Sequence, residues 1–102
     1  MDLEELKFVV KSDRFKVTIH ALQEKEADNI SLIDIEQSLV NSEIIEDYKN
    51  DKPFPSCLVL GFGNNSKPIH SVWAYNSDSK QAVLITVYRP NPEKWVEYRK
   101  RK

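Results

Sequence analysis

The N-terminal half of the chain carries two stripes of apolar residues at helical spacing. These stripes are Leu3, Leu6 and Val10, and then Leu32, Ile35 and Leu39. Residues three and four positions apart share one face of a helix, so amphipathic helices are predicted over residues 2–11 and 30–40. Ser31 is the expected cap of the second helix, and Asp34, three residues later, forms a weaker version of the reciprocal capping box.

Between these helices the pattern alternates from one residue to the next. Residues 15–19 place apolar and polar side chains on opposite faces, which predicts a half-buried strand. His20 follows this strand and leads into a less apolar helix over residues 21–27. Asp28 and Asn29 should end that helix, because asparagine tolerates the left-handed backbone found at helix ends.

Four strand-like runs follow in the second half of the chain. They are Glu43 to Tyr48, Cys57 to Phe62, Ile69 to Tyr75 and Ala82 to Tyr88. The segments between them are short and rich in asparagine, serine, aspartate, glycine and proline, which favours antiparallel neighbours. The whole pattern predicts an α+β fold, with N-terminal helices packed on a twisted, mainly antiparallel sheet of four to five strands.

Prolines shape the C-terminal end of the chain. Pro90 lacks the N–H group that a strand needs, so the last strand should stop there. Pro92 suits the first turn of a helix, and a short C-terminal helix is therefore expected over residues 93–98 with Asn91 as its cap.

The length of 102 residues fits one domain. Within it, residues 1–14 form the N-terminal helix, residues 15–98 the α+β core and residues 99–102 a basic tail. No run approaches the length of a membrane helix, and the opening residues lack the order of a secretion signal, so a cytoplasmic location is expected. Cys57, the single cysteine, should be a small core residue, and no metal or cofactor motif is present.

Charge is distributed unevenly although the net charge is only −1. Residues 1–51 carry 6 basic and 13 acidic side chains, whereas residues 52–102 carry 9 and 3. The basic half ends in Arg99, Lys100, Arg101 and Lys102, which suit phosphates or an acidic partner. The alternative is that these four charges form a solvated, frayed terminus.

Several short pieces of the sequence together resemble a known family. They are His20-Ala21-Leu22, Ile30-Ser31, Glu43-Ile44-Ile45-Glu46, Pro55-Ser56-Cys57-Leu58-Val59-Leu60-Gly61, Pro68-Ile69-His70, and Thr86-Val87-Tyr88-Arg89-Pro90 followed by Trp95. Their order and spacing resemble domain-of-unknown-function family 4258. That family is similar in topology to the RelE/ParE-like and BrnT-like toxins of bacterial toxin–antitoxin pairs. The resemblance implies a protein antitoxin as partner and RNA as substrate.

The chain departs from the family pattern in its second helix. The family usually has arginines at the positions of Glu24 and Asp28, and a glycine at the position of Asn29. Asparagine still allows the left-handed turn, so the fold is expected to be kept. Carboxylates repel a polyanion, so a phosphate-binding role of this helix is not expected.

The candidate catalytic residues are His20, His70, Tyr88 and Arg89. A ribonuclease that works without metal needs a group to take the proton of a ribose 2′-hydroxyl and cations to stabilise the phosphate. Histidine suits the first task near neutral pH, and arginine suits the second through its planar fork. Candidate RNA- or partner-binding residues are Lys94, Trp95, Arg99 and Arg101.

Structural roles compete with each of these assignments. Both histidines can be satisfied structural residues, and Tyr88 and Trp95 can close the rim of a core. Glu43, Glu46 and Asp47 suit a divalent ion or, more simply, a solvated strand edge. The sequence therefore supports two classes of function: a metal-independent endoribonuclease of the toxin type, or a non-catalytic module that binds a protein partner or a second copy of itself.

Overall fold

The structure is a computed structural model that describes residues 1–102, and its element order confirms the predicted α+β class. The helices are α1 (Leu3–Lys11), α2 (Ile19–Ala27) and α3 (Leu32–Val40). The strands are β1 (Phe15–Val17), β2 (Glu43–Tyr48), β3 (Ser56–Phe62), β4 (Pro68–Asn76), β5 (Gln81–Tyr88), β6 (Trp95–Val96) and β7 (Lys100–Arg101). None of the helices is long and apolar enough to cross a membrane.

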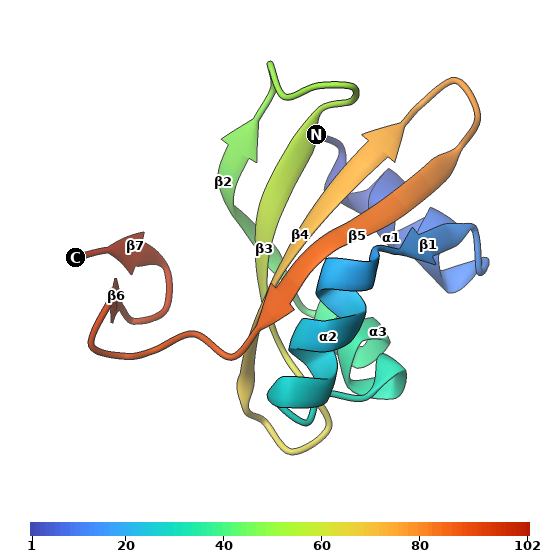
Figure 1. The fold of residues 1–102 in the computed structure, drawn as a ribbon. Coiled ribbons are helices and arrows are strands. Elements are labelled where there is room, and N and C mark those ends of the chain that lie inside the picture. The colour runs from blue at the N-terminus through green and yellow to red at the C-terminus, as the bar shows by residue number, and fades with distance from the viewer.

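The main sheet has five strands in the order β1-β5-β4-β3-β2 (Figure 1). Strands β2 to β5 form an antiparallel meander, as the short connectors predict. Strand β1 instead pairs in parallel with β5, so the sheet is mixed. Parallel pairing is possible here because the chain between β1 and β5 passes through two helices and three other strands before it returns.

Residues at the helix ends cap the helices, and the sequence predicted this at Ser31 and the helix stop at Asn29. The side chain of Asp2 accepts a hydrogen bond from the N–H of Glu5 at the start of α1. Ser31 and Asp34 form the predicted reciprocal capping box at the start of α3. Asn29 adopts a left-handed conformation with φ of 55° and ends the turn between α2 and α3. Local side-chain chemistry therefore sets three helix boundaries.

Two sequence predictions about the N-terminal half need correction. The strand predicted to reach Ile19 ends at Val17, because the Thr18 side chain accepts a hydrogen bond from the N–H of Ala21 and begins α2. Ile19 is 76% exposed as the first residue of that helix. Leu32, predicted to lie on the buried stripe of α3, is 43% exposed because it occupies the first turn.

The predicted C-terminal helix is wrong. Residues 95–101 form a small two-stranded hairpin, β6–β7, called here the C-terminal hairpin. The side chain of Asn91 accepts a hydrogen bond from the N–H of Glu93, but it closes only a local turn. Glu97 and Tyr98 have φ of 51° and 63°, so the chain turns through left-handed backbone and cannot continue as a helix.

A single core lies between the helices and one face of the sheet. Ile35 and Leu39 of α3 pack there with Trp73 of β4, and Cys57 is buried as predicted. Gly61 marks a close approach of α3 and β3, because a Cβ atom at this position would lie 1.7 Å from the carbonyl oxygen of Ser38. Glycine at this position therefore allows α3 to lie directly on the sheet.

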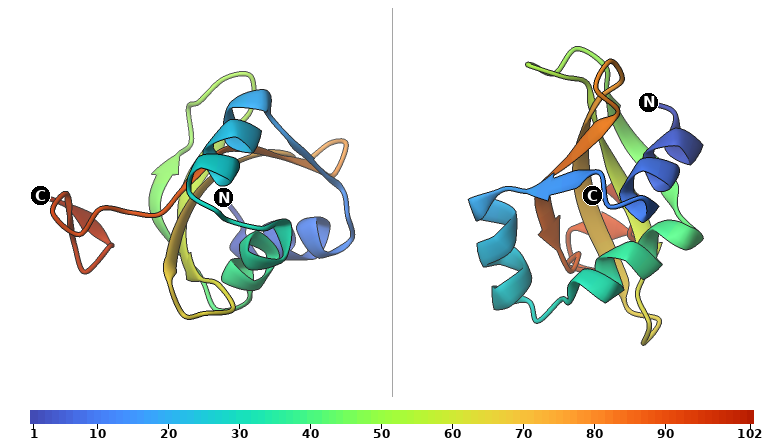
Figure 2. Two further views of the ribbon diagram at one scale, coloured as in Figure 1. Left: turned by 60° about the horizontal axis from the view of Figure 1, so that its bottom comes forward. Right: turned by 90° about the vertical axis from the view of Figure 1, so that its right-hand side faces the viewer.

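Helix α2 takes the place of a strand along the second half of β5. The carboxylate of Glu24 accepts a hydrogen bond from the N–H of Val87 at 3.2 Å, and that of Asp28 accepts one from the N–H of Arg89 at 2.9 Å. Four helical residues rise about 6 Å. Two strand residues rise about 6.7 Å. The two acidic side chains therefore match the outward-facing amides of the strand, and α2 stands beside the sheet edge, apart from α1 and α3 (Figure 2, right).

The sheet face opposite the helices is called here the outer face. The pairing register places on it the side chains of Glu43, Glu46, Leu58, Leu60, His70 and Tyr88. The chain leaves β5 through an extended linker, and the C-terminal hairpin lies on the side of the sheet away from α1 and α3 (Figures 1 and 2). Leu58, Leu60 and His70 are almost completely buried although they lie on this face.

Candidate functional site

A histidine–tyrosine pair forms the centre of the outer face. His70 of β4 lies directly across from Tyr88 of β5, and a bulge between Thr86 and Leu84 in β5 sets this register. The Nδ1 atom of His70 is 3.2 Å from the hydroxyl oxygen of Tyr88. Its Nε2 atom is 2.7 Å from the carbonyl oxygen of Tyr98. A carbonyl only accepts, so Nε2 carries the proton and Nδ1 accepts from the tyrosine.

Burial controls the protonation of this pair. The His70 side chain has no exposed surface, and burial lowers the pKa of the imidazole, while the Tyr98 carbonyl and Glu46 oppose this shift. Burial likewise raises the pKa of the Tyr88 phenol. The site therefore holds a neutral imidazole behind a neutral phenol near neutral pH.

The C-terminal hairpin adds an aromatic ring and a cation to the pair. The Trp95 ring packs edge-on against the ring of His70, with centroids 4.5 Å apart, and Trp95 is only 6% exposed. The guanidinium of Arg101 lies 4.7 Å from the centre of the Trp95 ring. Such a contact stabilises the cation over the ring face and fixes its position.

Two arginines of the C-terminal hairpin region bind two glutamates of β2. Arg99 Nε is 2.6 Å from a carboxylate oxygen of Glu43. Arg101 grips both carboxylate oxygens of Glu46, at 2.8 and 3.1 Å. The hydrogen bond from Arg101 lowers the pKa of Glu46, and Glu46 raises that of Arg101. The hydroxyl of Tyr48 also donates to Glu46.

A β-bulge makes this double pairing possible. Residues three apart in a regular strand point to opposite faces. The register of β2 shifts between Ile44 and Glu46, so Glu43 and Glu46 both face the outer side, opposite Leu60 and Leu58 of β3. From the sequence, these glutamates were expected to be metal ligands or a solvated strand edge, and their arginine partners were not predicted. The excess of acidic residues in the first half of the chain and of basic residues in the second half was the available indication of such ion pairs.

The other predicted site residues lie outside this cluster. His20 is on α2, where its Nε2 is 3.1 Å from the carboxylate of Glu24, and its side chain is 66% exposed. Lys94 is exposed, and its side chain makes no hydrogen bond or ion pair. The structure therefore brings together His70, Tyr88, Trp95 and Arg101, with Arg99 beside them, and does not join His20 to this group.

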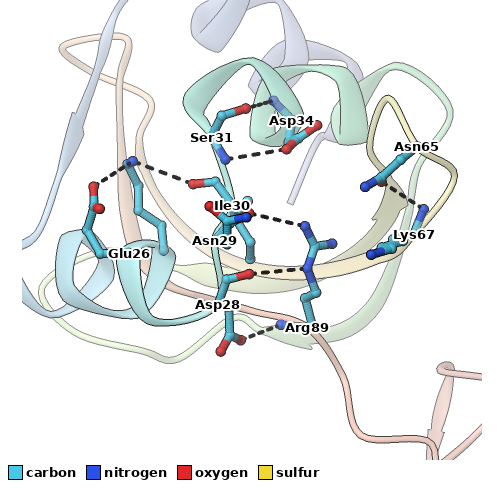
Figure 3. A pocket seen from close by; sticks show the side chains of 10 residues that line it. Glu26, Asp28, Asn29, Ile30, Ser31, Asp34, Asn65, Lys67 and Arg89 are labelled. Carbon is cyan, nitrogen blue, oxygen red and sulfur yellow. Dashed lines mark hydrogen bonds and ion pairs between the residues drawn. The ribbon is translucent and has the colours of Figure 1, made fainter.

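Arg89 lines a separate polar pocket beside the turn between α2 and α3 (Figure 3). Its Nε and Nη2 atoms point to the carbonyl oxygens of Asp28 and Asn29, at 3.4 and 3.5 Å. Its Nη1 atom is buried without a hydrogen-bond partner. A cation at the C-terminal end of a helix complements the free carbonyls there, so Arg89 ties the end of α2 to the end of β5.

No group of three or more histidine, cysteine, aspartate or glutamate side chains is placed to hold a metal ion. The chemistry available at the cluster is that of a proton relay from a phenol to an imidazole, next to a cation and an indole ring.

The chain has a small α+β fold with an aromatic and basic cluster on the outer face of its sheet. The family model described as domain of unknown function (DUF4258) matches residues 17–89, and the chain belongs to this family. No curated protein and no solved structure matches the chain. The predicted family is thus confirmed, and the matched segment includes His70 and Tyr88.

Proposed function

We propose that this protein is a RelE-like toxin domain, a metal-independent endoribonuclease that a protein antitoxin holds in check. The observation that carries the proposal is the gathering of His70, Tyr88, Trp95 and Arg101 on one face of the sheet. These residues come from three separate parts of the chain. They supply a proton acceptor and a cation, two of the groups that metal-independent RNA cleavage requires.

The hydrogen bonds of the pair suggest how the proton moves. The ribose 2′-hydroxyl attacks the adjacent phosphorus and passes its proton to the Tyr88 oxygen, while the Tyr88 proton moves to Nδ1 of His70. The Tyr98 carbonyl, which accepts from Nε2, stabilises the imidazolium that forms. Arg101 stabilises the charged phosphorane, and water protonates the leaving 5′-oxygen. The products are a 2′,3′-cyclic phosphate and a 5′-hydroxyl, and the imidazolium returns its proton to solvent.

A second candidate is the non-catalytic module that binds a protein partner or a second copy of the chain. The burial of His70 favours it, because a histidine with no exposed surface and two hydrogen-bonded nitrogens is also a satisfied structural residue. The pairing of Arg99 and Arg101 with glutamates favours it as well.

The decisive experiment measures RNA cleavage by the purified protein in the presence of a metal chelator. End-labelled single-stranded RNA and a translating extract are both used as substrates. We expect cleavage that leaves 2′,3′-cyclic phosphate ends and that fails on 2′-O-methylated RNA. Tyr88→Phe should lower the rate about 100-fold. The exposed Glu36→Gln on α3 serves as the control for folded protein.

Absence of cleavage in both settings by folded wild-type protein would favour the binding module, whose partner is then sought by pull-down. Growth after induced expression gives an independent reading, since a toxin should arrest growth and Tyr88→Phe should not. His20→Asn is included to test the remaining predicted histidine, which lies on α2 and pairs with Glu24.

A further inference from the structure

The arginine–glutamate pairs on the outer face have matching spacing. Glu43 and Glu46 lie opposite Leu60 and Leu58, two positions apart on β3, which corresponds to about 7 Å along a strand. Arg99, in the turn between β6 and β7, and Arg101, in β7, reach these two carboxylates at 2.6 and 2.8 Å. Each arginine therefore meets one carboxylate.

These pairs are open to solvent and can exchange partners. The side chains of Arg99 and Glu43 are 48% and 47% exposed, and that of Arg101 is 62% exposed, while that of Glu46 is 25% exposed. Exposed ion pairs contribute little net stability because water and salt compete with them. A phosphodiester presents two oxygens to a guanidinium fork in much the same geometry as a carboxylate. An incoming phosphate can therefore replace each glutamate.

We propose that Arg99 and Arg101 form a two-phosphate site for single-stranded RNA, and that Glu43 and Glu46 occupy this site in the free protein as built-in competitors. Trp95 lies beneath the guanidinium of Arg101 and helps to hold that cation in place. RNA as the natural ligand rests on the proposed function. The masking of the arginines rests only on the geometry of the pairs.

The masking has a consequence for the ionic-strength dependence of binding. An arginine that stays paired with its glutamate neutralises no phosphate, so it releases none of the cations condensed on the nucleic acid. Removal of both carboxylates exposes two cations. The slope of log affinity against log salt concentration should then become steeper by about 1.4, since each contact to a single strand contributes about 0.7.

The test uses a fluorescein-labelled single-stranded oligodeoxynucleotide, which lacks the 2′-hydroxyl and cannot be cleaved by the proposed route. Fluorescence anisotropy compares wild type with the double variant Glu43→Gln/Glu46→Gln over a range of salt concentrations. We expect affinity to rise about 5- to 10-fold at low salt, because two exposed pairs no longer compete with the phosphates. This gain in affinity should be absent when Arg99→Gln/Arg101→Gln is combined with the two glutamate substitutions.

The matched control is Glu36→Gln/Asp78→Asn, which makes the same change in net charge at exposed positions without ion pairs. Equal gains in this control and in the Glu43/Glu46 variant would overturn the proposal and assign the effect to overall charge. Unchanged binding by the Glu43/Glu46 variant would overturn it as well and leave the pairs a purely stabilising role. Circular dichroism checks that each variant is folded. If the double variant does not fold, Glu43→Gln alone replaces it, and the expected change in the slope of log affinity against log salt concentration is then half as large.

The outcome is separable from that of the proposed function. Tighter oligonucleotide binding without RNA cleavage supports the masked phosphate site and contradicts the ribonuclease. Cleavage by wild type without any gain on removing the carboxylates supports the ribonuclease and contradicts the masking.

Discussion

Tyr88 lies directly across from His70 in the β4–β5 pair, and its hydroxyl is the only donor to the Nδ1 atom of that buried imidazole. Tyr88→Phe keeps the ring and removes this donor. We expect a loss of about 1 kcal/mol in the free energy of unfolding, because a buried acceptor is left unpaired. Urea unfolding measures the loss. An unchanged midpoint would mean that the hydrogen bond contributes nothing in solution.

The protonation of His70 gives a pH-dependent stability. Burial lowers the pKa of the folded imidazole below its ordinary value of 6.5, so the unfolded chain binds the proton first as pH falls. Stability should be constant well above pH 6.5 and decrease as the pH falls below it. Urea unfolding between about pH 7.5 and 5 tests this. His20→Gln should show the same decrease, and a flat profile in wild type would contradict the assignment to His70.

Gly61 should tolerate no side chain. In Gly61→Ala the added Cβ would overlap the carbonyl oxygen of Ser38, so α3 must move away from β3. We expect a loss of about 3 kcal/mol or more, seen as a lower melting temperature and a lower soluble yield. Gly63→Ala is the matched comparison, because its nearest atoms are 3.1 and 3.2 Å away and include the end of the Asp34 side chain. A smaller loss for Gly61→Ala than for Gly63→Ala would contradict the packing described.

The carboxylates of α2 should stabilise β5 by satisfying its outward amides. Asp28→Ala leaves the N–H of Arg89 without its acceptor, and we expect a cost of about 1–2 kcal/mol. Glu26→Ala, two residues earlier on the exposed side of α2, should cost less than about 0.5 kcal/mol. Hydrogen exchange adds a local reading, since only Asp28→Ala should speed exchange at Arg89. Equal effects of the two variants would argue against a capping role.

The sequence predicted the strands well where the chain is apolar and bounded by turn residues. Strands β2 to β5 begin and end within one residue of the predicted runs. Prediction failed where one residue fits two structures. Thr18 fits an alternating strand and a helix cap equally well, and Asn91 before Pro92 matches the start of a helix although it closes only a turn.

The candidate site was predicted in part, because type and order of residues are visible in a sequence but strand register is not. His70 and Tyr88 come together through a bulge in β5, and Glu43 and Glu46 face one side through a bulge in β2. A bulge adds a single residue and leaves little trace in the hydrophobic pattern. The bulge in β2 also decides which glutamates meet Arg99 and Arg101, so the uneven charge of the two halves indicated pairing between them but not the partners.

Helix α2 lies beside β5 where a further strand would otherwise pair, and this limits how copies of the protein can associate. At that end of the sheet only the three residues of β1 offer unpaired backbone, which is too short a template for another chain. Strand β2, with six residues, is the one long free edge. Antiparallel pairing of two β2 strands about a two-fold axis would use up both free edges. Strand addition can therefore produce a closed dimer but cannot extend into a fibre.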